Sequence, residues 1–214
     1  MPTEDPDELQ RRARAFAAAG RVADAIRQYQ ALLGRVPDML GAAAELAELF
    51  ERLSEHEEAI RILDLAIARA AEPADLRVQR AGLLLALQRP GEAETELRAL
   101  LAQAPEHPGA QLQLGIALLR RGRFADAVEA LRRAAELAPG EPAPRYYLGE
   151  ALALANHLAE ASAALERAIE LAPGDSRSYQ LLGRVLDRMG QADRAVAMYR
   201  MAREAARGPG ARER

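Results

Sequence analysis

Small and large apolar residues recur along this chain at a fixed distance of 34 positions. The clearest series is an unbroken column of alanine, at Ala25, Ala59, Ala93, Ala127, Ala161 and Ala195. A second column holds only small residues, at Ala13, Ala47, Ala81, Gly115, Gly149 and Gly183. Three positions later a third column holds large apolar residues, at Phe16, Phe50, Leu84, Leu118, Leu152 and Leu186. Because a fixed period of this length is the signature of a repeat architecture, the chain is predicted to contain six repeats, at residues 6–39, 40–73, 74–107, 108–141, 142–175 and 176–209.

The apolar positions of each repeat describe two amphipathic helices. The second helix carries its own large column, at Tyr29, Leu63, Leu97, Leu131, Leu165 and Tyr199. Midway between the two helices stand Gly20, Ser54, Gln88, Gly122, Asn156 and Gly190. Four of these six are Gly or Asn, which adopt the left-handed conformation that ends a helix. The pattern therefore predicts an all-α fold of about twelve helices arranged as helix-turn-helix units.

Small residues in one helix allow the backbone of its neighbour to approach closely, while the large residues fill the space on either side. Each helix pair leaves an apolar face that the next pair covers, so an array of this kind is stable collectively. The third repeat departs most from the pattern, with Arg80 before the small position, Pro90 at the start of the second helix and Glu94 after Ala93. A proline in the first turn of a helix is tolerated, because its missing N–H would be unpaired there.

The Leu-Gly pairs Leu114-Gly115, Leu148-Gly149 and Leu182-Gly183, followed at fixed offsets by Ala, a large apolar residue, Ala and Pro, resemble the tetratricopeptide repeat. Pentatricopeptide arrays keep a period of 35 residues, which this chain does not. The resemblance implies a single right-handed superhelical α-solenoid over residues 6–209. Residues 1–5 would then form an N-terminal tail and residues 210–214 a disordered C-terminal tail.

In this family the first helices of successive repeats line a concave groove that binds a peptide or protein segment, which implies a non-catalytic adaptor. Carried over by column, the groove residues are Val78, Gln79, Leu112, Gln113, Ile116, Tyr146, Tyr147, Glu150, Arg177, Gln180, Arg184 and Arg188. Some of the apolar side chains have the alternative of packing inside the array, and this alternative stays open for Tyr146, Tyr147, Leu119 and Leu154. Family members that bind chaperone tails use a Lys/Asn/Arg clamp. The matching positions here are Gln10, Arg14, Glu45, Asp75 and Gln79, so that clamp is missing.

Composition argues against catalysis. The chain has no Cys, and all 29 of its Lys and Arg residues are Arg, which excludes thiolate and Schiff-base chemistry. His56, His107 and His157 do not share a repeat position and form no catalytic or metal-binding constellation. We therefore expect no cofactor and no metal. The acidic start lacks the features of a signal peptide, and no stretch approaches the length of a membrane span. Together with an arginine usage typical of GC-rich bacterial genomes, this favours a bacterial, cytoplasmic protein.

Charge is distributed unevenly. Residues 40–73 contain eight acidic residues and three Arg, whereas residues 176–214 contain nine Arg and four acidic residues. The apolar part of the predicted groove lies between these regions, which favours a partner with apolar anchors next to acidic residues. The alternative is a structural subunit built into a larger assembly through its ends or its convex face, and homo-oligomerisation through the ends is a further prediction. A net charge of −3 and the lack of aromatic stacking platforms in the basic region argue against nucleic-acid binding.

Overall fold

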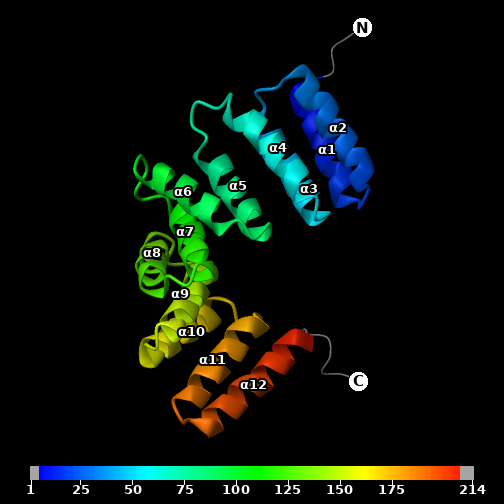
Figure 1. Ribbon diagram of the computed structural model, residues 1–214. Coiled ribbons are helices and arrows are strands. Elements are labelled where there is room, and N and C mark those ends of the chain that lie inside the picture. Colours follow the sequence, from blue (N-terminus) through cyan, green and yellow to red (C-terminus); the bar gives the residue numbers. More distant parts are fainter. Residues whose placement is uncertain (1–4, 208–214) are drawn as a thin grey trace. The chain divides into compact units, whose positions relative to one another are not determined.

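The computed structural model describes residues 5–207, which form twelve α-helices and no strands within that range (Figure 1). The helices are α1 (Pro6–Ala18), α2 (Val22–Arg35), α3 (Leu40–Arg52), α4 (His56–Ile67), α5 (Ala74–Ala86), α6 (Pro90–Leu101), α7 (Pro108–Arg120), α8 (Phe124–Leu137), α9 (Pro142–Leu154), α10 (Leu158–Leu171), α11 (Ser176–Arg188) and α12 (Ala192–Arg207). The predicted two helices per repeat are therefore confirmed. Of the predicted tails, the structure describes only Asp5, whose side chain accepts a hydrogen bond from the Asp7 amide at the start of α1; the rest of both tails lies outside the described residues.

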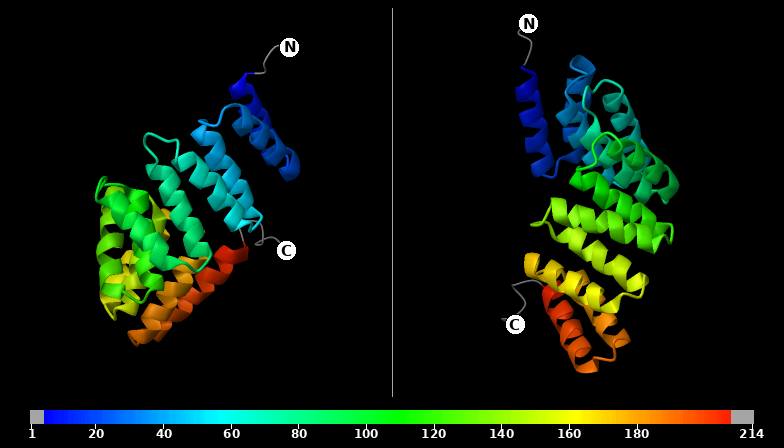
Figure 2. Two further views of the ribbon diagram at one scale, coloured as in Figure 1. Left: turned by 45° about the horizontal axis from the view of Figure 1, so that its top comes forward. Right: turned by 90° about the vertical axis from the view of Figure 1, so that its left-hand side faces the viewer.

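Contacts divide the chain into two compact units, Met1–Glu96 and Leu97–Arg214, with the division inside α6. We call them the N-terminal unit and the C-terminal unit. In the C-terminal unit, α7 packs against α8, α9 against α10, and α11 against α12, and each pair also packs on the next. Figure 2 shows these helices lying side by side in sequence order. The first helices α7, α9 and α11 form one layer, and the second helices α8, α10 and α12 form the other.

All six turns between paired helices have the same backbone conformation. The residue at the turn is left-handed in every repeat, including Ser54 at φ 62° and Gln88 at φ 59°. The next residue donates its N–H to the carbonyl of the large residue five positions earlier, for example Arg89 N to Leu84 O at 2.8 Å and His157 N to Leu152 O at 2.8 Å. This bond belongs to the Schellman motif, which satisfies carbonyls left open at a helix end. The predicted helix stop is confirmed, and it extends to the two turns that lack Gly or Asn.

The small and large columns meet inside the helix pairs. A Cβ placed on Gly149 would lie 2.5 Å from Leu165 Cγ, and one placed on Gly183 would lie 2.6 Å from Tyr199 Cε1. Gly115 stands in the same close relation to Leu131. Leu131 and Leu165 are fully buried. The glycines are therefore needed for the close approach of α9 to α10 and of its two sister pairs.

The unusual third repeat is held by ion pairs. Arg80 stands where Leu46, in the previous repeat, is fully buried. Its guanidinium donates to Glu96 Oε2 at 3.1 Å and Oε1 at 2.7 Å, and also binds Asp64. Burial lowers the pKa of Arg80, but hydrogen bonds to Glu96 and Asp64 outweigh that effect and raise it. Arg80 thus replaces an apolar contact with a partly buried ionic network. Pro90 is the first residue of α6, as predicted.

Candidate protein-binding surface

Ten of the twelve predicted groove residues lie on the three first helices of the C-terminal unit, α7, α9 and α11. Because α9 contacts both α7 and α11, the structure brings these ten residues onto neighbouring helices of one layer. We call this the first-helix surface. Val78 and Gln79 lie on α5 in the N-terminal unit, where the Gln79 side chain donates to the Ala44 carbonyl at 3.1 Å. The first-helix surface is therefore defined by the ten residues of the C-terminal unit.

Two adjacent tyrosines form the centre of the first-helix surface. Tyr146 and Tyr147 are both half-buried, with ring centroids 5.1 Å apart and an interplanar angle of 78°. The guanidinium carbon of Arg177 lies 5.4 Å from the centroid of Tyr146, in cation–π range. Burial raises the pKa of Tyr146, so its hydroxyl stays protonated at neutral pH. The pair offers a rigid aromatic surface that still has exposed area.

Glu150 lies one turn after the tyrosine pair and is partly buried. Burial raises the pKa of its carboxyl group, while Arg184 and Arg120 act in the opposite direction. Within the described residues Glu150 has no hydrogen bond, so its carboxylate oxygens are available as acceptors. Arg184, on α11, is exposed and one repeat further along the same column. The surface therefore places a free acceptor and a cation next to the aromatic pair.

The apolar residues of the predicted groove divide into three groups. Leu112 and Leu119 are partly exposed, together with Gln113. Ile116 is only 9% exposed, so it contributes to the packing of α7 and offers little area to a ligand, in line with the alternative that some apolar side chains of the groove pack inside the array. Leu154, for which inward packing was an alternative, is 50% exposed at the end of α9.

The basic residues of α11 differ in how firmly they are held. Arg188 donates to the Ala153 carbonyl at 2.7 Å and to Asn156 Oδ1 at 3.0 Å, which ties α11 to α9 and the turn after it. Arg177 pairs with Asp175 at 2.9 Å. Arg184 and Gln180 are exposed, and Arg184 has no hydrogen bond or ion pair within the described residues. Of the predicted cations, Arg184 is the one most available to a partner.

Glu45 organises a hydrogen-bonded network in the N-terminal unit that the sequence did not reveal. Gln10 and Arg14 of α1 and Tyr29 of α2 all donate to its carboxylate, the tyrosine at 2.7 Å. Burial alone would raise the pKa of Glu45, but these donors lower it overall. The same contact raises the pKa of Tyr29, after the larger effect of burial. These polar residues therefore join three helices.

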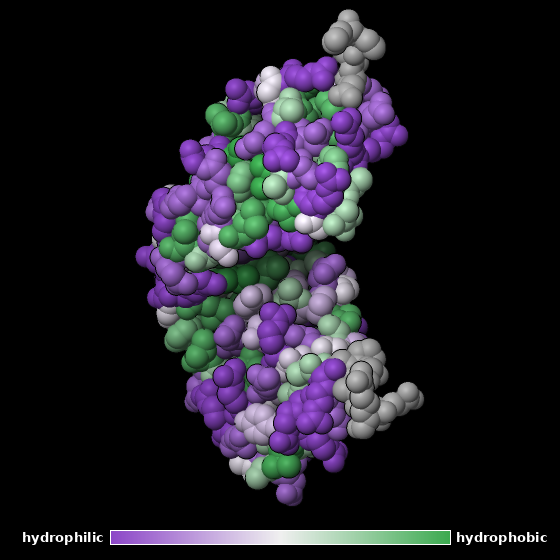
Figure 3. All heavy atoms as spheres, turned by 90° about the vertical axis from the view of Figure 1, so that its right-hand side faces the viewer, coloured by the Kyte–Doolittle hydropathy of each residue, from purple (hydrophilic) through white to green (hydrophobic). Residues whose placement is uncertain are grey.

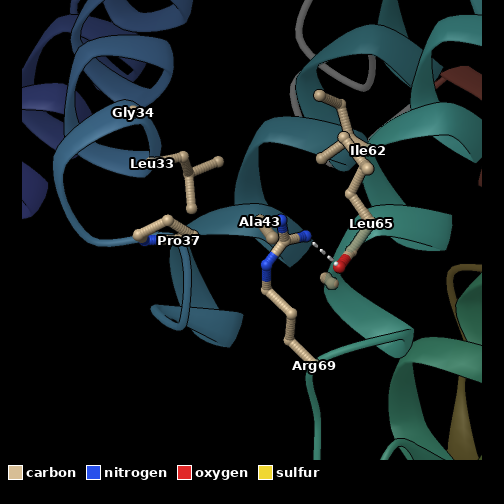
Figure 4. Close-up of a pocket in the computed structure, with 8 residues that line it drawn as sticks. Leu33, Gly34, Pro37, Ala43, Ile62, Leu65 and Arg69 are labelled. Atoms are coloured by element: carbon tan, nitrogen blue, oxygen red, sulfur yellow. Dashed lines mark hydrogen bonds between the residues drawn. The ribbon is translucent and has the colours of Figure 1, made fainter.

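A second surface feature lies on the N-terminal unit. A cavity of about 220 Å³ opens between α2, α3 and α4, lined by Leu33, Gly34, Pro37, Ala43, Ile62, Leu65, Ala66 and Arg69 (Figure 4). Leu65 is 58% exposed, and Arg69 donates to its carbonyl at 2.7 Å. Because its lining is mostly apolar and Leu65 is exposed, the cavity is open to an apolar side chain of a partner. On the face drawn in Figure 3, polar side chains cover most of the surface and apolar ones lie among them.

None of the helices within residues 5–207 is long and apolar enough to cross a membrane. No group of three or more His, Asp or Glu side chains in that range is arranged to hold a metal ion.

Comparison with known proteins identifies the repeat. Three tetratricopeptide repeat family models match the chain, the first at residues 11–75 and 78–142, the second at 118–182 and the third at 176–206. No curated protein matches the sequence. Among solved structures, MamA 41-end from Desulfovibrio magneticus RS-1 is 22% identical with a TM-score of 0.68, over 81% of this chain and 98% of that one.

Two other solved structures cover more of the chain. PilW, a widely conserved type IV pilus biogenesis factor, is 20% identical with a TM-score of 0.80, over 92% of this chain and 91% of its own. The APC/C hetero-tetramer Cut9-Hcn1 gives 16% identity and a TM-score of 0.84, over 97% of this chain and 41% of the other. At these identities the likenesses show the fold alone. The family models cover most of the sequence, and the chain belongs to the tetratricopeptide repeat family, whose repeats are protein-interaction modules.

Proposed function

We propose that the first-helix surface of the C-terminal unit binds a peptide or protein segment that carries an apolar side chain next to acidic residues. The single observation that supports this most is the half-buried pair Tyr146 and Tyr147 beside the free carboxylate of Glu150. Tyrosine contributes a large contact area at a low cost in side-chain entropy, and it is enriched at the residues that carry binding energy in protein interfaces.

The polar groups around the tyrosines suggest how a segment would be oriented. An apolar side chain of the partner would lie against the tyrosine rings and the exposed part of Leu112. The Glu150 carboxylate would accept a hydrogen bond from a backbone or side-chain N–H of the partner, and Arg184 would pair with its acidic side chain. A charged group left unpaired in a partly buried site is costly, so pairing on binding favours a matching segment over others.

The test starts from affinity capture with the purified chain in an extract of the native organism, followed by calorimetry with the purified partner. We expect Tyr147→Ala to weaken the affinity about 10- to 100-fold, by the ~1.4 to 3 kcal/mol typical of a central aromatic contact. Arg184→Glu should weaken binding further and make it less sensitive to salt.

The matched control is Arg167→Glu on α10, an exposed arginine in the other helix layer whose pairing partner is the nearby Glu170. It makes the same charge change away from the first-helix surface and should leave the affinity within about twofold of the original. If Tyr147→Ala and Arg184→Glu bind the captured partner as well as the unchanged chain while the helical content is preserved, the proposal is wrong.

The second candidate function is a structural subunit of a larger assembly, attached through the second-helix side. The apolar cavity beside Leu65 favours it, because a large exposed leucine is unusual at a column that holds Arg133 and Arg167 in later repeats. Leu65→Arg distinguishes the two functions, since it should abolish capture by a subunit interface and leave binding at the tyrosine pair unchanged. The cytoplasmic location expected from the sequence remains a prediction.

A further inference from the structure

The outward face of α12 is a helix-docking face with no helix on it among the described residues. Val128 in α8 and Ser162 in α10 occupy the same repeat position as Val196 in α12, and both are 7% exposed. In those repeats the first helix of the next repeat packs on the second helix: α9 packs on α8, and α11 packs on α10. Val196 is 65% exposed.

This face carries an apolar residue followed by three arginines. Val196, Arg200, Arg203 and Arg207 follow one another at intervals of four, three and four residues, which places them on one side of the helix. We call the three arginines the basic stripe. All are exposed, and none of their side chains has an ion pair or hydrogen bond within residues 5–207.

Among the arginines of residues 5–207, those without a hydrogen bond or ion pair are the minority. Elsewhere in the C-terminal unit several exposed arginines pair with carboxylates, as Arg133 does with Glu106 at 2.7 Å and Arg194 with Glu166 at 2.9 Å, whereas Arg184 of the first-helix surface does not. Glu204 stands next to Arg203 on this side of α12, so the basic stripe together with this carboxylate keeps a net charge of +2. It is suited to an acidic surface.

The chain itself contains a matching acidic surface. The side chains of Glu48 and Glu51 on α3, and of Glu55 in the turn that follows, are exposed and have no ion pair or hydrogen bond within the described residues. Arg52, also exposed, stands among them, so the region keeps a net charge of −2. We call them the acidic cluster. Their intervals of three and four residues equal those of the basic stripe, and Leu53 between them is 45% exposed.

We propose that the basic stripe of one molecule binds the acidic cluster of a second copy, with Val196 and Leu53 supplying apolar contact in the same interface. The two surfaces are complementary in charge, since each holds three like charges that pairing within the molecule leaves unmatched. Because the two surfaces are different, the contact is heterologous: each molecule offers one surface to the molecule before it and the other to the molecule after it. Association of this kind forms either an open chain of molecules or a closed ring. It should strengthen at low ionic strength, because salt screens the attraction less there: the Debye length is about 30 Å at 0.01 M and about 10 Å at 0.1 M.

The test measures mass by multi-angle light scattering over a range of protein concentrations at low and at high salt. The unchanged chain should rise from the monomer mass of 23.2 kDa to at least twice that value at low salt, and return to the monomer at high salt. The variant Arg200→Glu/Arg203→Glu/Arg207→Glu should remain monomeric under all these conditions, and so should Glu48→Arg/Glu51→Arg/Glu55→Arg.

Mixing these two variants provides the sharpest outcome. In an equimolar mixture each reversed surface again faces its opposite, so the mass should rise as it does for the unchanged chain. The control Arg11→Glu/Arg35→Glu/Arg69→Glu changes the net charge equally at three exposed arginines of the N-terminal unit that have no ion pair within the described residues, and it should still associate. Circular dichroism verifies that every variant is folded.

A constant monomer mass of the unchanged chain at low salt would overturn the proposal. It is equally overturned if the mixture of the two reversed variants stays monomeric, or if the control loses association as they do, because nonspecific charge effects would then account for the result. Binding at the first-helix surface is unaffected by these outcomes, since the tyrosine pair belongs to neither surface.

Discussion

At the scale of single residues, the glycine column decides how closely paired helices approach. A leucine at Gly149 would overlap the buried Leu165, so we expect Gly149→Leu to lower the free energy of unfolding by about 2 to 3 kcal/mol. Gly149→Ala should cost less, because alanine adds only the Cβ to the overlap, and its helix propensity, about 1 kcal/mol better than that of glycine, offsets part of it. Urea unfolding followed by circular dichroism measures both.

Gly140 is the control for this experiment. It lies in the turn before α9 with nothing within 4 Å of an added Cβ, so Gly140→Leu should stay within about 0.5 kcal/mol of the original stability. If Gly149→Leu were as stable as Gly140→Leu, the close approach of α9 and α10 would not depend on the glycine.

The burial and the hydrogen-bond partners of single side chains were the features that the sequence predicted least well. The columns assign a side chain to a side of its helix, but Ile116 stands at the edge of the buried side, and its 9% exposure depends on how closely neighbouring helices approach. Glu45 shows the same limit for polar residues. Its partners Gln10, Arg14 and Tyr29 belong to two other helices, and no periodicity in the sequence predicts that their donors converge on one carboxylate.

At the scale of helices and turns, the sequence predicted nearly all of the structure. The 34-residue period places two helices in each repeat, and Gly or Asn marks four of the six turns. Ser54 and Gln88 adopt the same left-handed conformation without the residue type that favours it, because the packed helices on either side fix the turn. For these two turns, the position in the column is the only signal in the sequence.

The shared left-handed conformation predicts that glycine is favourable at every one of these turns. Gln88→Gly removes a left-handed strain of about 1 to 2 kcal/mol and adds chain entropy to the unfolded state, so we expect a net stabilisation of about 0.5 kcal/mol. Gly122→Ala imposes the strain instead and should destabilise by about 1 kcal/mol, with no steric contribution because nothing lies within 4 Å of the new Cβ. Thermal unfolding of both variants measures these changes.

The control for these turn variants is Ala86→Gly on the exposed side of α5. It should destabilise by less than about 1 kcal/mol, the cost of glycine in a helix interior, because Ala86 is the last residue of α5. A stabilisation by Ala86→Gly, or a loss of stability in Gln88→Gly, would show that the turn conformation is not the cause.

At the scale of the whole molecule, the repeats differ in what holds them. The C-terminal unit pairs its first and second helices through glycines against large buried side chains, whereas the N-terminal unit has alanines in that column and relies on polar networks around Glu45 and Arg80. In a repeat array each repeat contacts only its neighbours, so a local perturbation should weaken over distance along the array. The family resemblance predicts this linear arrangement, but the division of contacts inside α6 had no signal in the sequence.

Hydrogen exchange followed by mass spectrometry can detect this local coupling. In Gly149→Leu we expect the amides of α9 and α10 to lose the most protection, those of the adjoining α8 and α11 to lose less, and those of α1 to α3 to remain as in the original chain. The reason is that α9 and α10 pack directly on α8 and α11, and opening free energies in folded proteins differ between cooperative segments. Equal loss of protection from α1 to α12 would instead show that the two compact units unfold as one, and the stability of the first-helix surface would then depend on the whole chain.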